Sequence, residues 1–147
     1  KKAFEKAIKN SKKTAMSLSD KFCVDRHKVN FLDLVKNSLD IIFANEQEIL
    51  SLIEAKTFDE VISFGKNLGK LMVITRGEKG SIAIKNEEIV EYGVQKNLKI
   101  VDLTGAGDLF AAGFLHGHIN NSSLKESLQK GTEMSSKIIQ KIGARLS

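Results

Sequence analysis

The sequence contains no proline or tryptophan and a single cysteine, Cys23, among its 147 residues. One cysteine excludes an internal disulfide, so we expect a reducing compartment such as the cytoplasm. The lack of proline, in contrast, decides nothing. No apolar run approaches the roughly 18 to 20 residues that a membrane span requires, and the charged first ten residues show no apolar core of a signal peptide. We therefore expect neither a membrane partner nor a secreted protein.

The sequence also lacks a basic tract. Its net charge is +5, from 23 Lys and Arg against 18 Asp and Glu, but the lysines are scattered along the chain. We therefore expect a solvated lysine surface and no nucleic-acid partner. His116 and His118 cannot share one helix face and have no carboxylate or cysteine at ligand spacing, which makes them poor metal ligands.

The length and composition are those of one globular domain, which we expect to span residues 1–147. Apolar patterns predict strands at 14–19, 40–44, 71–75, 81–85, 88–94 and 99–103. They predict helices at 1–10, 30–37, 46–54, 57–68, 106–119 and 123–142, with a loop at 20–29. Alternating strands and helices indicate an open, mostly parallel α/β sheet with helices on both faces. Ligands of such sheets bind beyond the carboxyl ends of the strands.

The segment VDLTGAGDLF (101–110) places two glycines at an expected strand-to-helix junction. Gly105 and Gly107 leave room for a ligand, and the N–H groups of Gly105, Ala106 and Gly107 would form an anion hole at a helix N-terminus. Such a hole stabilises the charge on a phosphoryl group in transfer. Asp108, in the first helical turn, could then accept a proton from an attacking hydroxyl. In the alternative interpretation, the segment is a tight turn and Asp108 is only a charge favoured by the helix dipole.

The longer stretch DLTGAGDLFAAGFL (102–115) resembles the signature D-T-x-G-A-G-D-x-F-x-x-G of ribokinase-like (phosphofructokinase-B) carbohydrate and nucleoside kinases. It departs at Leu103, where the family often has threonine. The resemblance implies a ribokinase-like α/β fold, with Asp108 as the general base that activates the substrate hydroxyl. It also implies that Gly105, Ala106 and Gly107 form the anion hole.

A second motif, NEQE, follows the expected strand at 40–44. Alone, the pattern is typical of a helix N-cap at Asn45 with solvated glutamates. Mg²⁺, however, favours oxygen ligands, keeps several waters and often needs only one or two carboxylates. Asn45 and Glu48 match the family's N-x-x-E motif. The resemblance therefore implies that Glu48 organises Mg²⁺ near the phosphates of ATP and that Asn45 belongs to the same cofactor site.

A third motif, TRGEKG, follows the expected strand at 71–75. By itself it is equally consistent with a turn that leads into a hairpin. It resembles the family's T-x-G-x-x-G motif through Thr75, Gly77 and Gly80. The resemblance implies that Thr75 and Gly77 lie along the nucleotide, with Gly80 at the same site.

The fourth motif is the segment IGAR at 142–145. The resemblance implies that this segment, with Gly143, closes the nucleotide pocket. In many family members its carbonyl groups contribute to a site for a monovalent cation such as K⁺. Asp102 and Thr104 would belong to that cation site.

The resemblance covers nearly the whole chain but only the C-terminal half of the family's length. The sequences of residues 18–27 and 40–48 most resemble those of bacterial adenosine kinase-like sugar kinases. We expect a phosphotransferase that uses ATP and Mg²⁺ to phosphorylate a small sugar or nucleoside, and a chain that is inactive in the absence of the family's N-terminal half. A homodimer could form through the lid of that half. The alternative is a nucleotide-binding module without an acceptor site.

Overall fold

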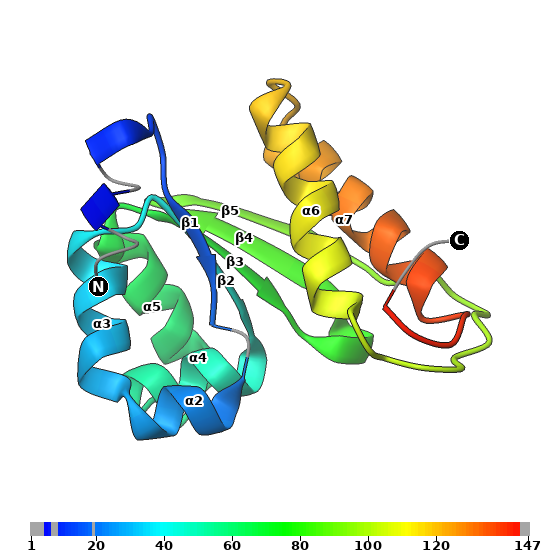
Figure 1. Ribbon diagram of the computed structural model, residues 1–147, viewed down its shortest axis with the longest axis horizontal. Helices are drawn as coiled ribbons and strands as arrows, with labels where there is room; N and C mark the ends of the chain where they lie inside the picture. The colour runs from blue at the N-terminus through cyan, green and yellow to red at the C-terminus, as the bar shows by residue number, and fades with distance from the viewer. Residues whose placement is uncertain (1–4, 7–8, 19, 145–147) are drawn as a thin grey trace. The chain divides into compact units, whose positions relative to one another are not determined.

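The computed structural model describes residues 5, 6, 9–18 and 20–144 (Figure 1). The pattern that predicts a helix at 1–10 depends on Ala3, Phe4, Ala7 and Ile8, which lie outside the described residues. Five strands form one sheet in the order β1 (Ala15–Ser17), β2 (Ile41–Asn45), β3 (Leu71–Thr75), β4 (Ser81–Lys85) and β5 (Glu88–Tyr92). The helices are α2 (Lys21–Arg26), α3 (Lys28–Asn37), α4 (Glu46–Ile53), α5 (Phe58–Leu68), α6 (Ala106–Ile119) and α7 (Leu124–Ile138).

The sheet combines parallel and antiparallel strands. β1 and β2 are parallel, with Ala15 opposite Ile41. β4 and β5 are neighbours joined by only Asn86 and Glu87, a connection that is too short for a parallel pair and therefore makes a hairpin. Asn86 has a φ of 53°, the left-handed conformation that two-residue hairpin turns favour. The expected open α/β sheet is thus present, and its hairpin end is antiparallel, as the pattern at 81–94 predicts.

The central strands carry the core. All four apolar residues in each of the runs 41–44 and 71–74 are buried. Strands with such continuous apolar runs are covered on both faces, which is why the sequence shows no alternation there. The helices that connect them have well-defined ends. Thr57 accepts a hydrogen bond from the Glu60 N–H at the start of α5, and Gly69, with a φ of 70°, ends that helix as predicted.

Two predictions of secondary structure are wrong. Residues 20–29, expected to be a loop, contain α2, which begins because Asp20 Oδ1 accepts a hydrogen bond from the Phe22 N–H at 2.9 Å. Residues 99–103, expected to be a strand, belong to no strand. Their backbone bonds instead to the end of α7, where the Ile139 carbonyl accepts the N–H groups of Val101 at 2.7 Å and Asp102 at 3.2 Å.

By its internal contacts the chain divides into two compact units, and each is described separately. One consists of Lys1–Ile74 with Ile84–Ile89, and the other of Thr75–Ala83 with Val90–Ser147. Within the second unit, α6 and α7 pack closely because glycines remove side chains at their contact. A Cβ on Gly113 would lie 2.5 Å from the Lys130 carbonyl oxygen, and one on Gly131 would lie 2.8 Å from that of Phe110.

In the first unit, one carboxylate joins the starts of β1 and β2. Asp40 Oδ2 accepts hydrogen bonds from the Thr14 N–H at 2.7 Å and from its hydroxyl at 3.1 Å. In return the Asp40 N–H donates to the Thr14 carbonyl at 2.9 Å. The Thr14 backbone N–H is the main cause of a pKa of Asp40 below its ordinary value of 3.8.

These bonds predict how stability depends on pH. Because the folded protein lowers the pKa of Asp40, its contribution is fully present above about pH 4 and is lost as the pH falls through the lower folded-state value. The Asp40→Asn variant should therefore be less stable than the wild type at pH 7, and this difference in stability should narrow as the pH falls below about 4. Urea unfolding at a series of pH values measures the gap, and a constant gap would contradict this role.

Candidate nucleotide-binding site

The glycine-rich loop forms a tight turn into α6. Gly105 is the N-cap of the helix and has a φ of 78°, a left-handed conformation that L side chains rarely adopt. A Cβ on Gly105 would also lie 2.8 Å from the Cβ of Ala144. Glycine is therefore required here both by the backbone conformation and by the neighbouring segment.

Three N–H groups at the start of α6 are available to a ligand. Those of Gly105, Gly107 and Asp108 make no hydrogen bond with any described residue. The Ala106 N–H, which we also expected in the anion hole, donates to the Leu103 carbonyl at 3.2 Å, and the first helical bond runs from Leu109 to Gly105. The turn thus replaces the Ala106 amide with that of Asp108, and the free amides lie at the positive end of the helix dipole.

Gly107 has no structural reason to be glycine. Its φ is not in the left-handed region, and a Cβ built on it meets nothing within 4 Å. Glycine costs about 1 kcal/mol relative to alanine inside a helix, so the fold alone would favour alanine at this position. The missing side chain leaves open space beside the free amides.

Asp108 lies in the first turn of α6 and is exposed. Its carboxylate makes no hydrogen bond or ion pair with any described residue. A carboxylate without a partner beside free amides has both oxygens open to a proton from a bound molecule. This position is consistent with a general base and with the simpler role of a first-turn charge.

Asp102 serves a different purpose. One carboxylate oxygen accepts the Thr104 hydroxyl at 2.7 Å and the Thr104 N–H at 2.9 Å, and the other accepts the Gly143 N–H at 2.9 Å. The Thr104 hydroxyl, followed by these N–H groups, lowers the pKa of Asp102 to about 2. Asp102 thus ties the C-terminal segment to the glycine-rich loop. The expected K⁺ site at Asp102 and Thr104 stays a prediction.

The T-x-G-x-x-G motif links β3 to β4. Gly77 and Gly80 have φ values of 58° and 87°, and the Arg76 N–H donates to the Gly80 carbonyl at 2.8 Å. A Cβ on Gly80 would clash with the Tyr92 carbonyl oxygen. Both glycines are therefore required by the turn itself. This agrees with the interpretation of the motif as a turn that leads into a hairpin.

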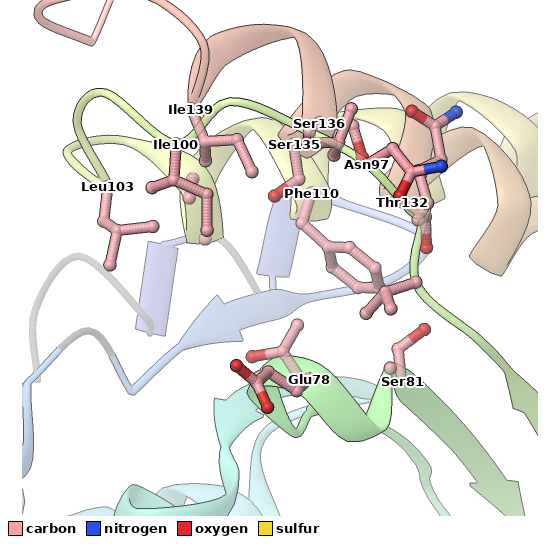
Figure 2. A pocket seen from close by; sticks show the side chains of 18 residues that line it. Glu78, Ser81, Asn97, Ile100, Leu103, Phe110, Thr132, Ser135, Ser136 and Ile139 are labelled. Carbon is pink, nitrogen blue, oxygen red and sulfur yellow. The ribbon is translucent and has the colours of Figure 1, made fainter.

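The same motif also lines a pocket of about 550 Å³, within the range of small-molecule sites (Figure 2). The pocket lies wholly within the second unit and brings the T-x-G-x-x-G motif together with the start of α6. Of the residues predicted from the sequence, it is lined by Thr75, Gly77, Gly80, Ala106 and Gly107. Two distant motifs of the chain thus share one cavity.

Sequence reasoning missed most of the other residues that line this pocket. The apolar ones are Val94, Leu98, Ile100, Leu103, Phe110 and Ile139, and the polar ones are Glu78, Ser81, Gln95, Asn97, Thr132, Ser135 and Ser136. One signal was available on α7, where three small hydroxyl residues occur at the i, i+3 and i+4 spacing of one helix face. The apolar residues at 94–103 gave no such signal, because they suggest a strand.

Asn45 and Glu48 form a capping box at the start of α4, in the first unit. The Asn45 Oδ1 accepts the Glu48 N–H at 2.8 Å, and Glu48 Oε2 accepts the Asn45 N–H at 2.8 Å. The Asn45 side-chain amide donates to Glu48 Oε1 at 2.9 Å. Glu48 is 5% exposed, and this burial raises its pKa.

This geometry bears on the expected Mg²⁺. Each Glu48 oxygen already accepts one hydrogen bond, and the side chain is buried, so direct coordination would disrupt the cap. A carboxylate oxygen has a second lone pair, and Mg²⁺ usually keeps several waters. Asn45 and Glu48 therefore fit a metal that is held through its waters. Among the described residues, no group of three His, Cys, Asp or Glu side chains is placed to hold a metal directly.

Comparison with known proteins decides the family. Residues 2–147 match the pfkB family of carbohydrate kinases. The chain belongs to this family. The adenosine kinase of Sinorhizobium meliloti has a TM-score of 0.92 and 40% identity, over 99% of this chain and 45% of that protein. This likeness confirms the ribokinase-like α/β fold expected from the motifs.

Two further pfkB relatives show the range of the family. A probable sugar kinase from Rhizobium etli has a TM-score of 0.91 and 37% identity, over 98% of this chain and 44% of its own. The cytidine kinase of Thermococcus kodakarensis is 35% identical over 112 residues, which are 74% of this chain and 40% of the relative. The chain spans less than half the length of each relative. In the described part of the chain, no helix is long and apolar enough to cross a membrane.

The two glycines of the loop predict opposite effects on stability. Gly105→Ala should destabilise the protein by at least about 1 kcal/mol, because it forces a left-handed alanine against Ala144. Gly107→Ala should leave stability unchanged or raise it by up to about 1 kcal/mol, because the helix gains a better helix former in open space. Urea or thermal unfolding of the two variants checks this contrast. Equal losses would show that Gly107 is also required by the fold.

Proposed function

We propose that the protein transfers the γ-phosphoryl group of ATP to a hydroxyl group of a small sugar or nucleoside. The observation that carries this proposal is the largely apolar cavity that Gly107, one of the three residues with a free amide, lines at the start of α6. A nucleoside triphosphate has the same division, with an anionic chain at one end and a flat base at the other. Relatives named adenosine kinase, cytidine kinase and probable sugar kinase support both classes of acceptor.

In this proposal the start of α6 stabilises the phosphoryl group. The N–H groups of Gly105, Gly107 and Asp108 donate to its oxygens as charge develops, and the helix dipole adds to their effect. The absent side chain of Gly107 lets the oxygens approach the backbone. These donors are held by the turn before the substrate arrives, so they need no reorganisation during the reaction.

Asp108 is the proposed general base. Its carboxylate accepts the proton of the acceptor hydroxyl as that oxygen attacks the γ-phosphorus, and the bond to the departing ADP oxygen breaks. No described side chain competes for this carboxylate. Asp102, by contrast, holds the loop and the segment at Gly143 together and takes no proton.

Asn45 and Glu48 would hold Mg²⁺ through its waters, and the metal would neutralise charge on the phosphates. The expected K⁺ stays a prediction, and no step of this proposal depends on it. In the second candidate function, the chain binds the nucleotide without transferring a phosphoryl group. This alternative is favoured by the location of the whole pocket within residues 75–139. Titration of Mg-ATP together with a phosphotransfer assay over a panel of sugars and nucleosides separates the two functions, because binding without transfer to any acceptor would favour the module.

Replacement of Asp108 tests the proposed chemistry. In the full-length protein, Asp108→Asn should lower kcat by about 10² to 10⁴ and leave the KM for ATP near that of the wild type, as loss of a general base does. Steady-state assays with the best acceptor from the panel give both constants. Unchanged turnover would exclude Asp108 as the base.

Asp59 provides a matched control. It is also an exposed aspartate in the first turn of a helix, α5, and it lies in the other unit. Asp59→Asn should cost only the roughly 0.3 to 1 kcal/mol of stability typical of a first-turn charge, with no effect on turnover. An equal loss of activity in both variants would point to a general effect of helix stability instead of catalysis.

A further inference from the structure

Ser81 is a buried polar residue without a partner. It is the first residue of β4 and is 4% exposed. Its Oγ makes no hydrogen bond, and it is the one fully buried side-chain nitrogen or oxygen with no partner among the residues described. A buried hydroxyl that bonds to nothing destabilises a folded protein, so this position needs an explanation.

Three other buried polar side chains have partners. The Thr14 hydroxyl donates to the Ser38 carbonyl at 2.7 Å, and the Ser127 hydroxyl donates to the Ser123 carbonyl at 2.9 Å. The buried Glu48 is held by its capping box. These three groups, none of which lines the pocket, are satisfied within the protein, whereas the Ser81 hydroxyl is not.

The location of Ser81 supplies the explanation. Ser81 lines the 550 Å³ pocket. Figure 2 shows its side chain pointing from β4 toward the side of the pocket where Phe110 and Thr132 lie. The preceding Gly80 is fixed by its φ of 87° and by its close approach to the Tyr92 carbonyl oxygen, which holds the start of β4 in place. The unpartnered hydroxyl is thus aimed into a cavity by a rigid turn.

The surroundings of Ser81 suit the base of a nucleotide better than its phosphates. Phe110 lies three residues beyond Gly107 on α6, about 4.5 Å further along the helix axis from the free amides. Figure 2 shows the apolar ring of Phe110 on the side of the pocket that Ser81 faces. A nucleobase has apolar faces and polar edges, whereas a ribose carries hydroxyls that would all need partners.

We propose that the Ser81 hydroxyl forms a hydrogen bond with an edge of the nucleobase of the phosphoryl donor, and so contributes to the choice of donor. This inference rests on the proposed function, which places a nucleotide in the pocket. A hydroxyl both donates and accepts, so it pairs with either a ring nitrogen or an exocyclic amino group of the base. Binding of the base then satisfies the fully buried side-chain atom that is left unpaired among the described residues.

The Ser81→Ala variant of the full-length protein tests this proposal. The Kd for the Mg²⁺ complex of a non-hydrolysable ATP analogue should rise about three- to tenfold, the effect of one neutral hydrogen bond. The Kd for inorganic tripolyphosphate, which has no base, should not change. Without ligand, the Tm should stay the same or rise, because the variant loses a polar group that had no partner. Isothermal titration and thermal unfolding give these values.

Ser127→Ala is the matched control, because Ser127 is a fully buried serine whose hydroxyl has a partner. It should lower Tm by about 2 to 4 °C and leave both Kd values unchanged. For Ser81→Ala, an unchanged nucleotide Kd, or an equal change for tripolyphosphate, would overturn the role of Ser81. If the wild type binds the analogue, neither result for Ser81→Ala contradicts the proposed function. If the wild type binds no nucleotide, both proposals fail.

Discussion

The candidate site depends on one backbone constraint, the left-handed conformation of Gly105 at the start of α6. The chain turns at Gly105, directly after Leu103 and Thr104, and α6 begins at Ala106. The N–H groups of Gly107 and Asp108, in the first turn, therefore have no acceptor within the helix. Ala144 lies against Gly105, and Asp102 holds Gly143. Residues 143 and 144 therefore hold the turn in place through these two contacts. A side chain on Gly105 would disturb the turn and this contact together.

The same few bonds explain why the two aspartates of the loop differ. The Asp102 carboxylate accepts three short hydrogen bonds within the protein, and these bonds lower its pKa to about 2. Asp108 lies six residues further along the chain and makes no such bonds with any residue that the structure describes. A carboxylate that is fully bonded positions its neighbours, whereas one with open oxygens can exchange a proton with a ligand. In the proposed mechanism, Asp102 therefore has a structural role and Asp108 accepts the proton.

The sequence predicted the elements whose signals are local. The bounds of β3 and α6 agree with the patterns at 71–75 and 106–119, since glycine or polar residues mark their ends. The strand expected at 99–103 failed for a physical reason. Its Ile100 and Leu103 are 64% and 65% exposed and line the pocket, and alternation in a sequence cannot distinguish a face that packs on a sheet from one that borders a cavity. The hydroxyls of α7 were missed because small polar residues on a helix usually face solvent.

Buried polar groups give a further distinction that no sequence pattern contains. Glu48 is nearly as buried as Ser81, yet its oxygens are bonded to Asn45, and the cost of its burial appears as a raised pKa. The Ser81 hydroxyl is neutral, so its burial does not appear as a pKa shift. It appears instead as a missing hydrogen-bond partner. A protein tolerates such a group where something outside the described chain supplies the bond. The unpaired atom is thus evidence about the occupant of the pocket, in the same way that the empty space at Gly107 is evidence about its phosphate end.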